Sequence, residues 1–276
     1  VIIIDNGSTD SSERFIKDNF KEAVFIKLDK NYGFARAVNT GIRQATGKYI
    51  ILLNNDTEMD KKCIQYLVEA ADKHPEVGMV AAKIINFYKR NIIDNAGDYI
   101  DTVGHLFTYG FGEKDGPKFN TPRYLFAVTG GGSLFKREVF ETIGYFDEDY
   151  FLYMEDVDLC FRAQLAGFKA WYEPKAVIYH KRMVTSKKNM AFVEPQCFRN
   201  MTMNVIKDFP KALLLHNNNW LKILLVNINT AVYLTRKGYF WGALEAEWDV
   251  LWNINKLLQK RKKIQKQVKM KLAKMT

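Results

Sequence analysis

Acidic and aromatic side chains are concentrated between Gly144 and Arg162. A buried core strand would not tolerate so many carboxylates, because an unpaired buried charge is costly. A solvated acidic face would not need so many rings. We therefore expect one wall of a site, in which apolar surroundings can shift a carboxylate pKa. The six acids are Asp147, Glu148, Asp149, Glu155, Asp156 and Asp158, and five of the rings are Tyr145, Phe146, Tyr150, Phe151 and Tyr153.

Asp156 is the candidate general base of this stretch. It lies at the start of a predicted helix, Asp156–Ala166, which Gly167 ends. Acids in a first turn are stabilised by the helix dipole, so Glu155 and Asp156 could simply favour the helix start. The acids and rings just before them favour a catalytic role, since a partly apolar wall raises the basicity of a carboxylate. Asp158 and Arg162, four apart on the helix, are expected to pair with each other.

Asp56 is a candidate metal ligand. It follows the apolar run Tyr49–Leu53, which predicts a central strand. Ligands of open α/β sheets lie beyond the carboxyl ends of strands. A carboxylate there, near Asn54, suits a divalent cation shared with phosphates. Asn-Asn-Asp is also good turn chemistry, and the two interpretations have equal weight.

Three further motifs have weaker signals. Asp5 begins DNGSTD, for which a turn and helix cap is the simpler explanation. Thr129–Ser133, TGGGS, could wrap a phosphate or permit close approach of a substrate, but it lacks the lysine of a P-loop. His180 ends an apolar strand beside two cations, Lys181 and Arg182, and could bind a metal or a diphosphate, although a lone histidine is more often structural.

Strands and helices alternate over the first part of the chain. This alternation predicts an α/β fold with a mainly parallel sheet. The predicted strands are Val1–Ile4, Val24–Leu28, Tyr49–Leu53 and Val77–Ala82, with helices ending near Phe20, over Phe34–Ala45, and after a capping Asp60. Two more short strands are expected at Ala170–Tyr172 and Ala176–Tyr179.

Composition narrows the class of protein. The 276 residues, 47% apolar, are enough for one large domain or for a domain with an extension. Three scattered cysteines argue against a disulfide or zinc framework. The net charge of +10 comes almost entirely from nine Lys and Arg between Lys256 and Lys274, so it does not indicate a nucleic-acid-binding body.

The last third of the chain changes character at Glu194. Residues 219–235 are apolar but interrupted, and too short to span a bilayer comfortably. Residues 239–258 combine tryptophans with leucines, and the basic tail follows. This pattern is typical of helices lying in a membrane interface, with a packed helical cap as the alternative. We therefore divide the chain into a domain, 1–193, and a helical extension, 194–276.

The motifs together resemble the inverting family 2 glycosyltransferases of GT-A fold, and among them a rhamnosyltransferase-like branch that builds bacterial surface polysaccharides. The resemblance covers residues 1 to about 182. It rests on the order and spacing of Asp5–Asp10, Asn31–Asn39 (NYGFARAVN), Gly47–Asp56, Thr129–Gly132, Gly144–Glu148 and Glu155–Arg162.

The resemblance implies a role for each candidate residue. Asp5 would contact the nucleotide base, and Asn54 and Asp56 occupy the metal motif. Asp56 would bind Mg²⁺ or Mn²⁺, with His180 joining the metal or diphosphate. Asp156 would be the general base, beside Glu155. The donor pocket would also use Arg36, Asn39, Gly130, Gly131 and Gly132, and the acceptor side Asp147, Glu148 and Arg199.

The implied activity is inverting sugar transfer from a UDP- or dTDP-sugar, possibly a rhamnosyl donor, to a lipid-linked or polysaccharide acceptor. It would take place at the cytoplasmic face of the membrane, with the protein peripheral there. No nucleic-acid partner is implied.

The chain departs from the family pattern in two places. The family normally has a β-α unit, about 30–40 residues, before the DNGSTD strand, and this unit is missing here. Gln196-Cys-Phe-Arg199 is followed by Asn200 instead of the tryptophan of processive members, which favours single addition. Two alternatives stay open: a non-catalytic nucleotide- or glycan-binding remnant, and a nucleotidyltransferase on a related scaffold.

Overall fold

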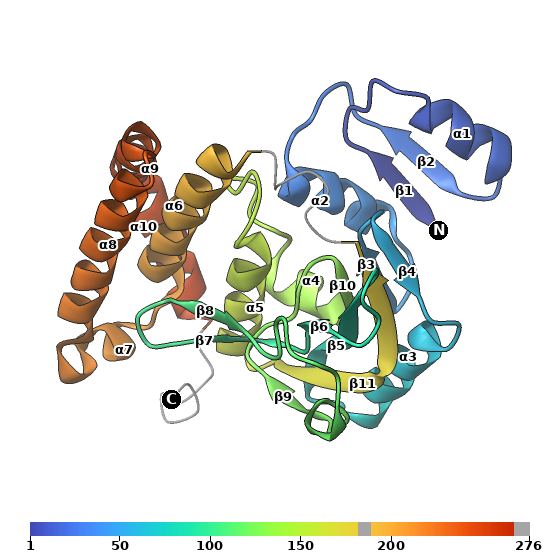
Figure 1. Cartoon of the computed structure of the whole chain (residues 1–276). Helices are drawn as coiled ribbons and strands as arrows, with labels where there is room; N and C mark the ends of the chain where they lie inside the picture. The colour runs from blue at the N-terminus through green and yellow to red at the C-terminus, as the bar shows by residue number, and fades with distance from the viewer. Residues whose placement is uncertain (182–188, 268–276) are drawn as a thin grey trace.

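A central sheet of seven strands organises the protein, and the computed structural model describes residues 1–181 and 189–267 (Figure 1). Its strands follow the order β3-β10-β5-β11-β4, with β6 beside β5 and β9 beside β11. The bounds are β3 Tyr49–Leu53, β4 Thr57–Met59, β5 Val77–Asn86, β6 Ile93–Asn95, β9 Arg123–Leu125, β10 Gly132–Lys136 and β11 Lys169–His180.

The α/β class is confirmed, but the prediction of a mainly parallel sheet is wrong. Within this sheet only β5 and β11 pair in parallel. β10 enters antiparallel between β3 and β5, because the chain returns through the irregular segment 87–131 instead of through a crossover helix. The two short strands expected near residues 170–179 are one strand, β11, whose register shifts between Glu173 and Val177, around Pro174.

Helices cover both faces of the sheet. Alternate residues of β5 point to opposite layers. Val80 and Ala82 pack with Leu67 of α3, Cys63–Lys73, whereas Met79 and Ala81 belong to the core that includes Leu159. That second layer contains α2 Phe34–Gln44, α4 Arg137–Ile143 and α5 Glu155–Leu165. The result is a three-layer α/β/α arrangement with β5 at its centre.

The N-terminal strands form a sheet of their own. β1, Ile2–Asp5, pairs in parallel with β2, Val24–Lys27, and α1, Ser12–Asn19, connects them. Among the described residues β1 pairs only with β2, and β3 pairs only with β10, so each has an unpaired edge. Within residues 1–181 and 189–267, the remaining short elements are the hairpin of β7 Asp98–Ile100 and β8 Leu106–Thr108 and the 3₁₀ turns Pro117–Phe119 and His216–Asn218.

In the part of the chain that the structure describes, five α-helices follow β11 and fold back against the preceding domain (Figure 1). The boundary expected at 193/194 falls inside α6, which begins at Met190. Phe161 of α5 packs with Phe209 and with Ile264 of α10, so this region shares a core with the sheet layer. The helices are α6 Met190–Asp208, α7 Lys211–Leu215, α8 Asn219–Arg236, α9 Phe240–Trp252 and α10 Ile254–Lys266.

A buried ion network fastens these helices to the acidic stretch. Lys207 of α6 is fully buried, and its Nζ lies 2.5 Å from Asp147 Oδ2 and 2.6 Å from Asp158 Oδ1. Asp158 also accepts hydrogen bonds from Arg162 Nε at 2.9 Å and Nη2 at 2.7 Å, which confirms the expected pair. Lys260 of α10 lies 2.5 Å from the other oxygen of Asp147. Burial alone would raise the pKa of Asp147, but the two lysines hold it well below its ordinary value.

This network changes the interpretation of two sequence features. Asp147, expected on the acceptor side, has its carboxylate committed to Lys207 and Lys260. The basic tail begins on α10, where the half-exposed Lys256 pairs with Asp149, its Nζ lying 2.6 Å from Oδ1. The part of that tail beyond residue 267 lies outside the described residues, as does Arg182.

Lys207→Met should lower the free energy of unfolding by about 3–5 kcal/mol, because Asp147 and Asp158 would lose a buried cation. Urea unfolding followed by circular dichroism measures the change. Lys256→Met is the matched control. Its side chain is half-exposed and contacts only one carboxylate, so it should cost about 1 kcal/mol or less. Equal costs for the two variants would contradict the importance assigned to the buried network.

Candidate functional site

The sequence-predicted loops meet at the N-terminus of α2. Asn6 Nδ2 donates to Asn31 Oδ1 at 2.9 Å and to Gly33 O at 3.0 Å, which joins the DNGSTD and NYGF segments. The Phe34 amide donates to Phe151 O at 2.7 Å. Gly33 has φ +82°, and a Cβ there would lie 2.2 Å from that same oxygen, so this contact requires glycine. The acidic stretch is therefore fixed against both N-terminal motifs.

The TGGG turn joins the end of β3 to the start of α5. The Asn54 amide donates to Gly131 O at 3.2 Å, and the Gly130 amide donates to Asp156 Oδ2 at 3.0 Å. A Cβ on Gly131 would lie 2.4 Å from Asn54 Nδ2, and one on Gly130 would lie 3.5 Å from the Asp156 Cβ. These glycines permit the close approach of two motifs about a hundred residues apart. Gly132 differs, since it lies within β10 and packs against Ile84 and Ile178.

Asp56 and His180 face each other, as a shared metal role requires. His180 Nε2 lies 3.4 Å from Asp56 Oδ2, because β4 pairs with the end of β11 and sets His180 opposite Thr57. His180 Nδ1 lies 2.6 Å from Asp94 Oδ2. A carboxylate on the far ring nitrogen orients a ligating histidine. Asp94 comes from the short strand β6, and no sequence pattern links it to His180.

The Asp56–His180 pair fits a divalent cation. Asp56 Oδ1 is buried and has no hydrogen-bond partner among the described residues, so one carboxylate oxygen is available to a ligand. The described residues hold no group of three or more His, Cys, Asp or Glu placed to bind a metal. Two protein ligands are enough where phosphate oxygens and water complete the coordination, as Mg²⁺ prefers.

Asp156 and Glu155 are basic carboxylates at the start of α5. Asp156 Oδ1 accepts a hydrogen bond from the Val157 amide at 2.9 Å, so with the Gly130 bond both oxygens are oriented. Burial nevertheless raises the pKa of Asp156 above its ordinary value. Glu155 is buried, and burial together with the charge of Asp156 raises its pKa well above the ordinary value. Its Oε2 has no partner within the described part of the chain.

The turn immediately before these two carboxylates has a strained backbone. Tyr153 and Met154 have φ of 68° and 66°, a left-handed conformation that costs a non-glycine residue about 1–2 kcal/mol. Asn200 of α6, fully buried, donates from Nδ2 to Leu152 O at 3.0 Å and Tyr153 O at 2.7 Å. Asn204 Nδ2 donates to Met154 O at 3.4 Å. Helix α6 thus sets the position of α5's first turn. Our sequence analysis missed both asparagines, and the only signal was Asn200 in place of the family tryptophan.

Asn39 and the exposed Glu148 are hydrogen-bonded to each other. Asn39 is buried, and its Nδ2 donates to Phe146 O and to Glu148 Oε1, both at 2.9 Å. Arg43 Nη2 donates to the same Glu148 oxygen at 3.1 Å. Burial would raise the pKa of Glu148, but Asn39 and Arg43 keep it below its ordinary value. The geometry therefore supports a bracing role for this pair, in place of the donor and acceptor contacts expected from the resemblance.

Asp5 and Arg36 lie at the N-terminal loops, and each keeps polar atoms that could contact a ligand. Asp5 Oδ1 accepts a hydrogen bond from the Ser8 amide at 2.8 Å, while Oδ2 is buried without a partner among the described residues. The exposed Arg36 guanidinium stacks 3.8 Å from the centre of the Tyr32 ring. Both groups can still contact a ligand, Asp5 as an acceptor and Arg36 as a donor.

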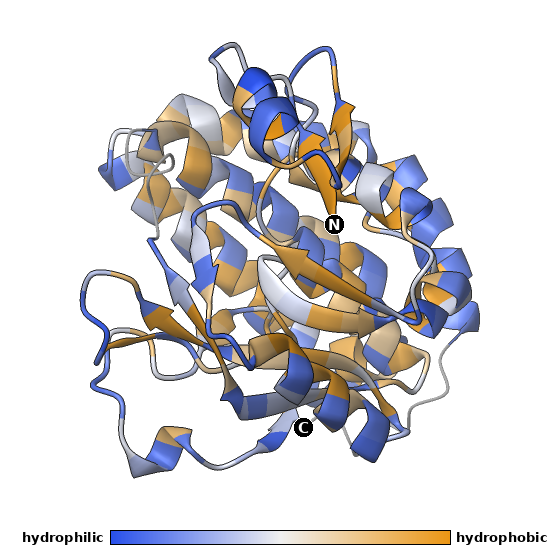
Figure 2. Ribbon diagram, turned by 90° about the vertical axis from the view of Figure 1, so that its right-hand side faces the viewer, coloured by the Kyte–Doolittle hydropathy of each residue, from blue (hydrophilic) through white to orange (hydrophobic). Residues whose placement is uncertain are grey.

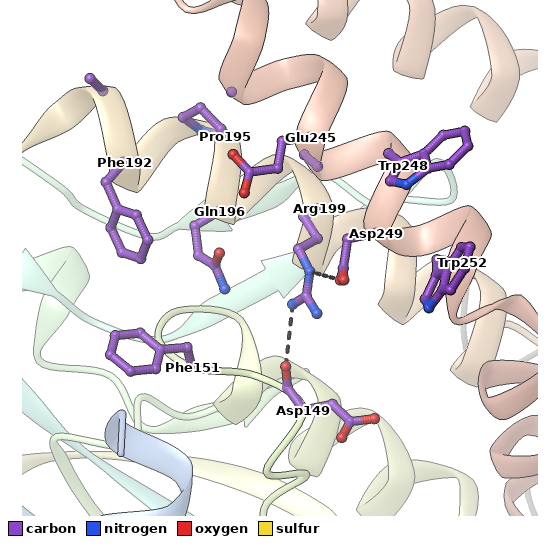
Figure 3. A pocket seen from close by; sticks show the side chains of 13 residues that line it. Asp149, Phe151, Phe192, Pro195, Gln196, Arg199, Glu245, Trp248, Asp249 and Trp252 are labelled. Carbon is purple, nitrogen blue, oxygen red and sulfur yellow. Dashed lines mark hydrogen bonds and ion pairs between the residues drawn. The ribbon is translucent and has the colours of Figure 1, made fainter. Parts of the chain in front are cut away.

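Arg199 lines a cavity of about 600 Å³ between α6, α9 and the acidic stretch (Figure 3). Its Nε lies 2.5 Å from Asp249 Oδ2, and its Nη1 donates to Asp149 O at 3.2 Å and to Asn200 Oδ1 at 2.8 Å. The guanidinium therefore braces the cavity wall. Sequence analysis did not find this cavity, because α9 contributes half of its walls.

Comparisons with known proteins support the resemblance to family 2 glycosyltransferases. The family model described as glycosyl transferase family 2 matches residues 1–144. Poly-beta-1,6-N-acetyl-D-glucosamine synthase of Staphylococcus epidermidis is 28% identical over 181 residues, covering 65% of this chain and 42% of the relative. The same enzyme of Staphylococcus aureus strain COL is 28% identical over 182 residues, with the same coverage. The chain spans about two fifths of the length of these relatives.

Solved structures share the fold. GalNAc-T7 with UDP, GalNAc and Mn²⁺ superposes with a TM-score of 0.57 at 15% identity, over 74% of this chain and 41% of that one. The mannosyltransferase PcManGT from Pyrobaculum calidifontis, with GDP-Man and Mn²⁺, gives 0.54 at 16%, over 97% and 74%. S. aureus TarS gives 0.50 at 15%, over 81% and 37%. These likenesses confirm the GT-A type of α/β fold.

The hold of α6 on the strained turn can be tested with Asn200→Ala. The variant should lose about 1–3 kcal/mol of stability, because two partly buried carbonyls lose their donor. Amide hydrogen exchange should rise in residues 152–157 more than elsewhere. Thr202→Val, on the same helix and equally enclosed, is the control, since the Thr202 hydroxyl bonds only to Phe198 O and Asn227. Uniform exchange changes in both variants would show that α6 does not set this turn.

Proposed function

The chain belongs to glycosyl transferase family 2, and we propose that it transfers a sugar, with inversion, from a nucleotide-sugar to a glycan acceptor. One observation carries this proposal: the TGGG turn bonds both to the strand end that leads to Asp56 and to Asp156. A carboxylate that could hold a diphosphate-neutralising cation and a carboxylate that could accept a proton are thereby joined through one turn.

Asp56 and His180 are the proposed metal ligands, and the bound Mg²⁺ or Mn²⁺ would neutralise the donor diphosphate. The unpartnered Asp56 oxygen supports this assignment, as does the carboxylate that orients His180. Two proteins of similar fold are described with Mn²⁺. Asn54, which begins the metal motif, is proposed on the donor side, in contact with Gly131.

Asp156 is the proposed general base. Its carboxylate would take the proton of the acceptor hydroxyl, and the Gly130 and Val157 amides hold it in one orientation. Its raised pKa makes it a stronger base than an exposed aspartate. Glu155 is kept as its positioning neighbour. One base on the acceptor side and one stabilised leaving group give a single displacement, and hence inversion at the anomeric carbon.

The donor proposal is an N-acetylglucosamine or rhamnosyl nucleotide. The curated relatives are named for N-acetylglucosamine polymer synthesis, and a TarS structure of similar fold is described with UDP-GlcNAc. The rhamnosyl alternative follows from the motif resemblance. Asp5 and Arg36 are the proposed contacts to the nucleotide, with Asp5 Oδ2 available to accept a hydrogen bond.

We also propose that one more β-α unit completes the donor pocket. The unpaired edges of β1 and β3 support this, since backbone groups at two neighbouring sheet edges can receive a strand. In Figure 1 the β1–β2 sheet lies beside the β3 end of the central sheet.

Residues 194–276 are proposed to bind the cytoplasmic face of the membrane, next to a lipid-linked acceptor. No helix in the described ranges is long and apolar enough to cross a bilayer. Helix α8 nevertheless has an exposed apolar face, formed by Trp220, Leu221, Leu224, Leu225, Ile228 and Val232. These positions fall on one side of a helix, the arrangement of an interfacial segment. Figure 2 shows that the strands are largely hydrophobic, whereas the helices carry both hydrophobic and hydrophilic residues.

Asp156→Asn should lower the transfer rate by about 10²–10⁴-fold while leaving donor affinity unchanged, because the amide cannot accept the proton. A nucleotide-sugar panel with Mn²⁺ measures nucleotide release and product, with chelator as the metal control. In the wild type the rate should fall at acid pH from a value above 3.8, the pKa of an ordinary aspartate, because the raised pKa protonates Asp156 sooner.

Three results would contradict this function or its assigned base. Full turnover by Asp156→Asn would show that Asp156 is not the general base. A product with a new diphosphate instead of a new glycosidic bond would favour a nucleotidyltransferase, and donor binding without any turnover would favour the non-catalytic alternative.

The double variant Leu225→Glu and Ile228→Glu should lower binding to phosphatidylcholine–phosphatidylglycerol vesicles by about tenfold or more, because two apolar side chains leave the interface. Flotation measures the bound fraction. Phe15→Glu, an equally exposed ring on α1, should leave it unchanged. Membrane binding that survives the double variant would count against α8 as the contact.

A further inference from the structure

The cavity between α6, α9 and the acidic stretch has features of a ligand site. Its volume of about 600 Å³ falls in the range of small-molecule pockets, about 300–1,000 Å³. Helix α9 lies outside residues 1–144, the part that the family model matches. The cavity is therefore built largely by two helices, α6 and α9, that the family model does not match.

Aromatic rings stand at both ends of the cavity, with polar groups between them (Figure 3). Phe151 and Phe192 meet edge to face, with centroids 6.1 Å apart. Trp248 and Trp252 are stacked, with centroids 6.4 Å apart and planes at 29°. The negative face of an indole attracts the weakly positive C–H groups of a pyranose ring. Such a pair of rings, one helical turn apart, suits consecutive sugar units.

The unpaired charge in the cavity is negative. Arg199 is committed to Asp249, and Asp149 is paired with Lys256 and Lys260. The Glu245 carboxylate has no cation or hydrogen-bond donor in contact within residues 1–181 and 189–267. It points toward Gln196 across the cavity in Figure 3. A carboxylate and an amide can bind sugar hydroxyls, whereas an anionic glycan would be repelled.

The cavity adjoins the proposed catalytic carboxylates. Phe151, in its wall, accepts the hydrogen bond from Phe34 at the N-terminus of α2. Asn200, beside the cavity-lining Arg199 on α6, donates to the carbonyls of Leu152 and Tyr153, which lead into Glu155 and Asp156. A chain bound in the cavity would therefore end near Asp156.

Helix α9 separates this cavity from the apolar face of α8. With 3.6 residues per turn, Leu244, Trp248, Leu251 and Trp252 fall within an arc of about 100° and form one exposed stripe on α9. The same helix packs against α8. A glycan that stacks on the two indoles would therefore lie along this exposed stripe.

We propose that this cavity binds the growing end of a neutral glycan acceptor, with Trp248 and Trp252 as the stacking platform and Glu245 and Gln196 as hydroxyl partners. The assignment deepens the proposed function and rests on it for the identity of the ligand as an acceptor. It names the acceptor class: a pyranose oligosaccharide without acidic groups.

The test is binding of a β-1,6-linked N-acetylglucosamine oligosaccharide to the whole chain without donor, by ligand-observed NMR titration. The variant Trp248→Ala with Trp252→Ala should weaken binding by about tenfold or more, the loss expected for two stacking contacts. Glu245→Gln should weaken it less. Trp241→Ala is the control, since this indole is also exposed on α9 but does not line the cavity. An oligogalacturonate should bind weakly or not at all.

Donor turnover separates this proposal from the proposed function. If the tryptophan variant keeps donor affinity and metal-dependent donor hydrolysis but has a raised acceptor KM, the cavity is an acceptor site. If the oligosaccharide binds through the tryptophans but no donor is turned over, the cavity is a glycan site and the transferase assignment fails. Undetectable binding to the wild type, equal binding to the tryptophan variant, or equal binding of oligogalacturonate would overturn the proposal.

Discussion

The buried ammonium group of Lys207 is the contact on which the rest of the structure depends. It lies between Asp147, before α5, and Asp158, within α5, and it comes from α6. Without it, two carboxylates would be left in an apolar interior, where each ion carries a desolvation penalty of several kcal/mol. The cation therefore requires the acidic stretch and the helical region to fold together. The helices after β11 are therefore part of the framework that holds the acidic stretch in place.

The local elements could be predicted from the sequence. The apolar run Tyr49–Leu53 is β3 at the expected bounds, and Asp158 and Arg162 pair as their spacing predicts. The antiparallel direction of β10 could not be predicted, because this strand reaches its place between β3 and β5 through a long irregular segment. Periodicity carries no information about which strand an edge will receive. The fate of Asp147 depended on Lys207, 60 residues away in sequence.

The candidate site was predictable to the same extent. The glycines of the TGGG turn indicated that another group approaches the backbone closely there. Their hydrogen bonds bring the end of β3 and the start of α5 together. The motifs singled out Asp156 as the candidate base, but they could not show that the carboxylate of Glu148 accepts hydrogen bonds from Asn39 and Arg43. Asp94 and Asn200 carry no motif at all. Their roles arise from contacts across the fold, which only the tertiary arrangement reveals.

The strained turn at Tyr153 and Met154 has a consequence for the order of assembly. Its carbonyls are bonded by Asn200, 47 and 48 residues further along the chain. During synthesis from the N-terminus, the sheet strands up to β11 are complete before α6 exists. Glu155 and Asp156 are therefore synthesised before the side chain that supports their turn, and the turn gains this support only after α6 has formed.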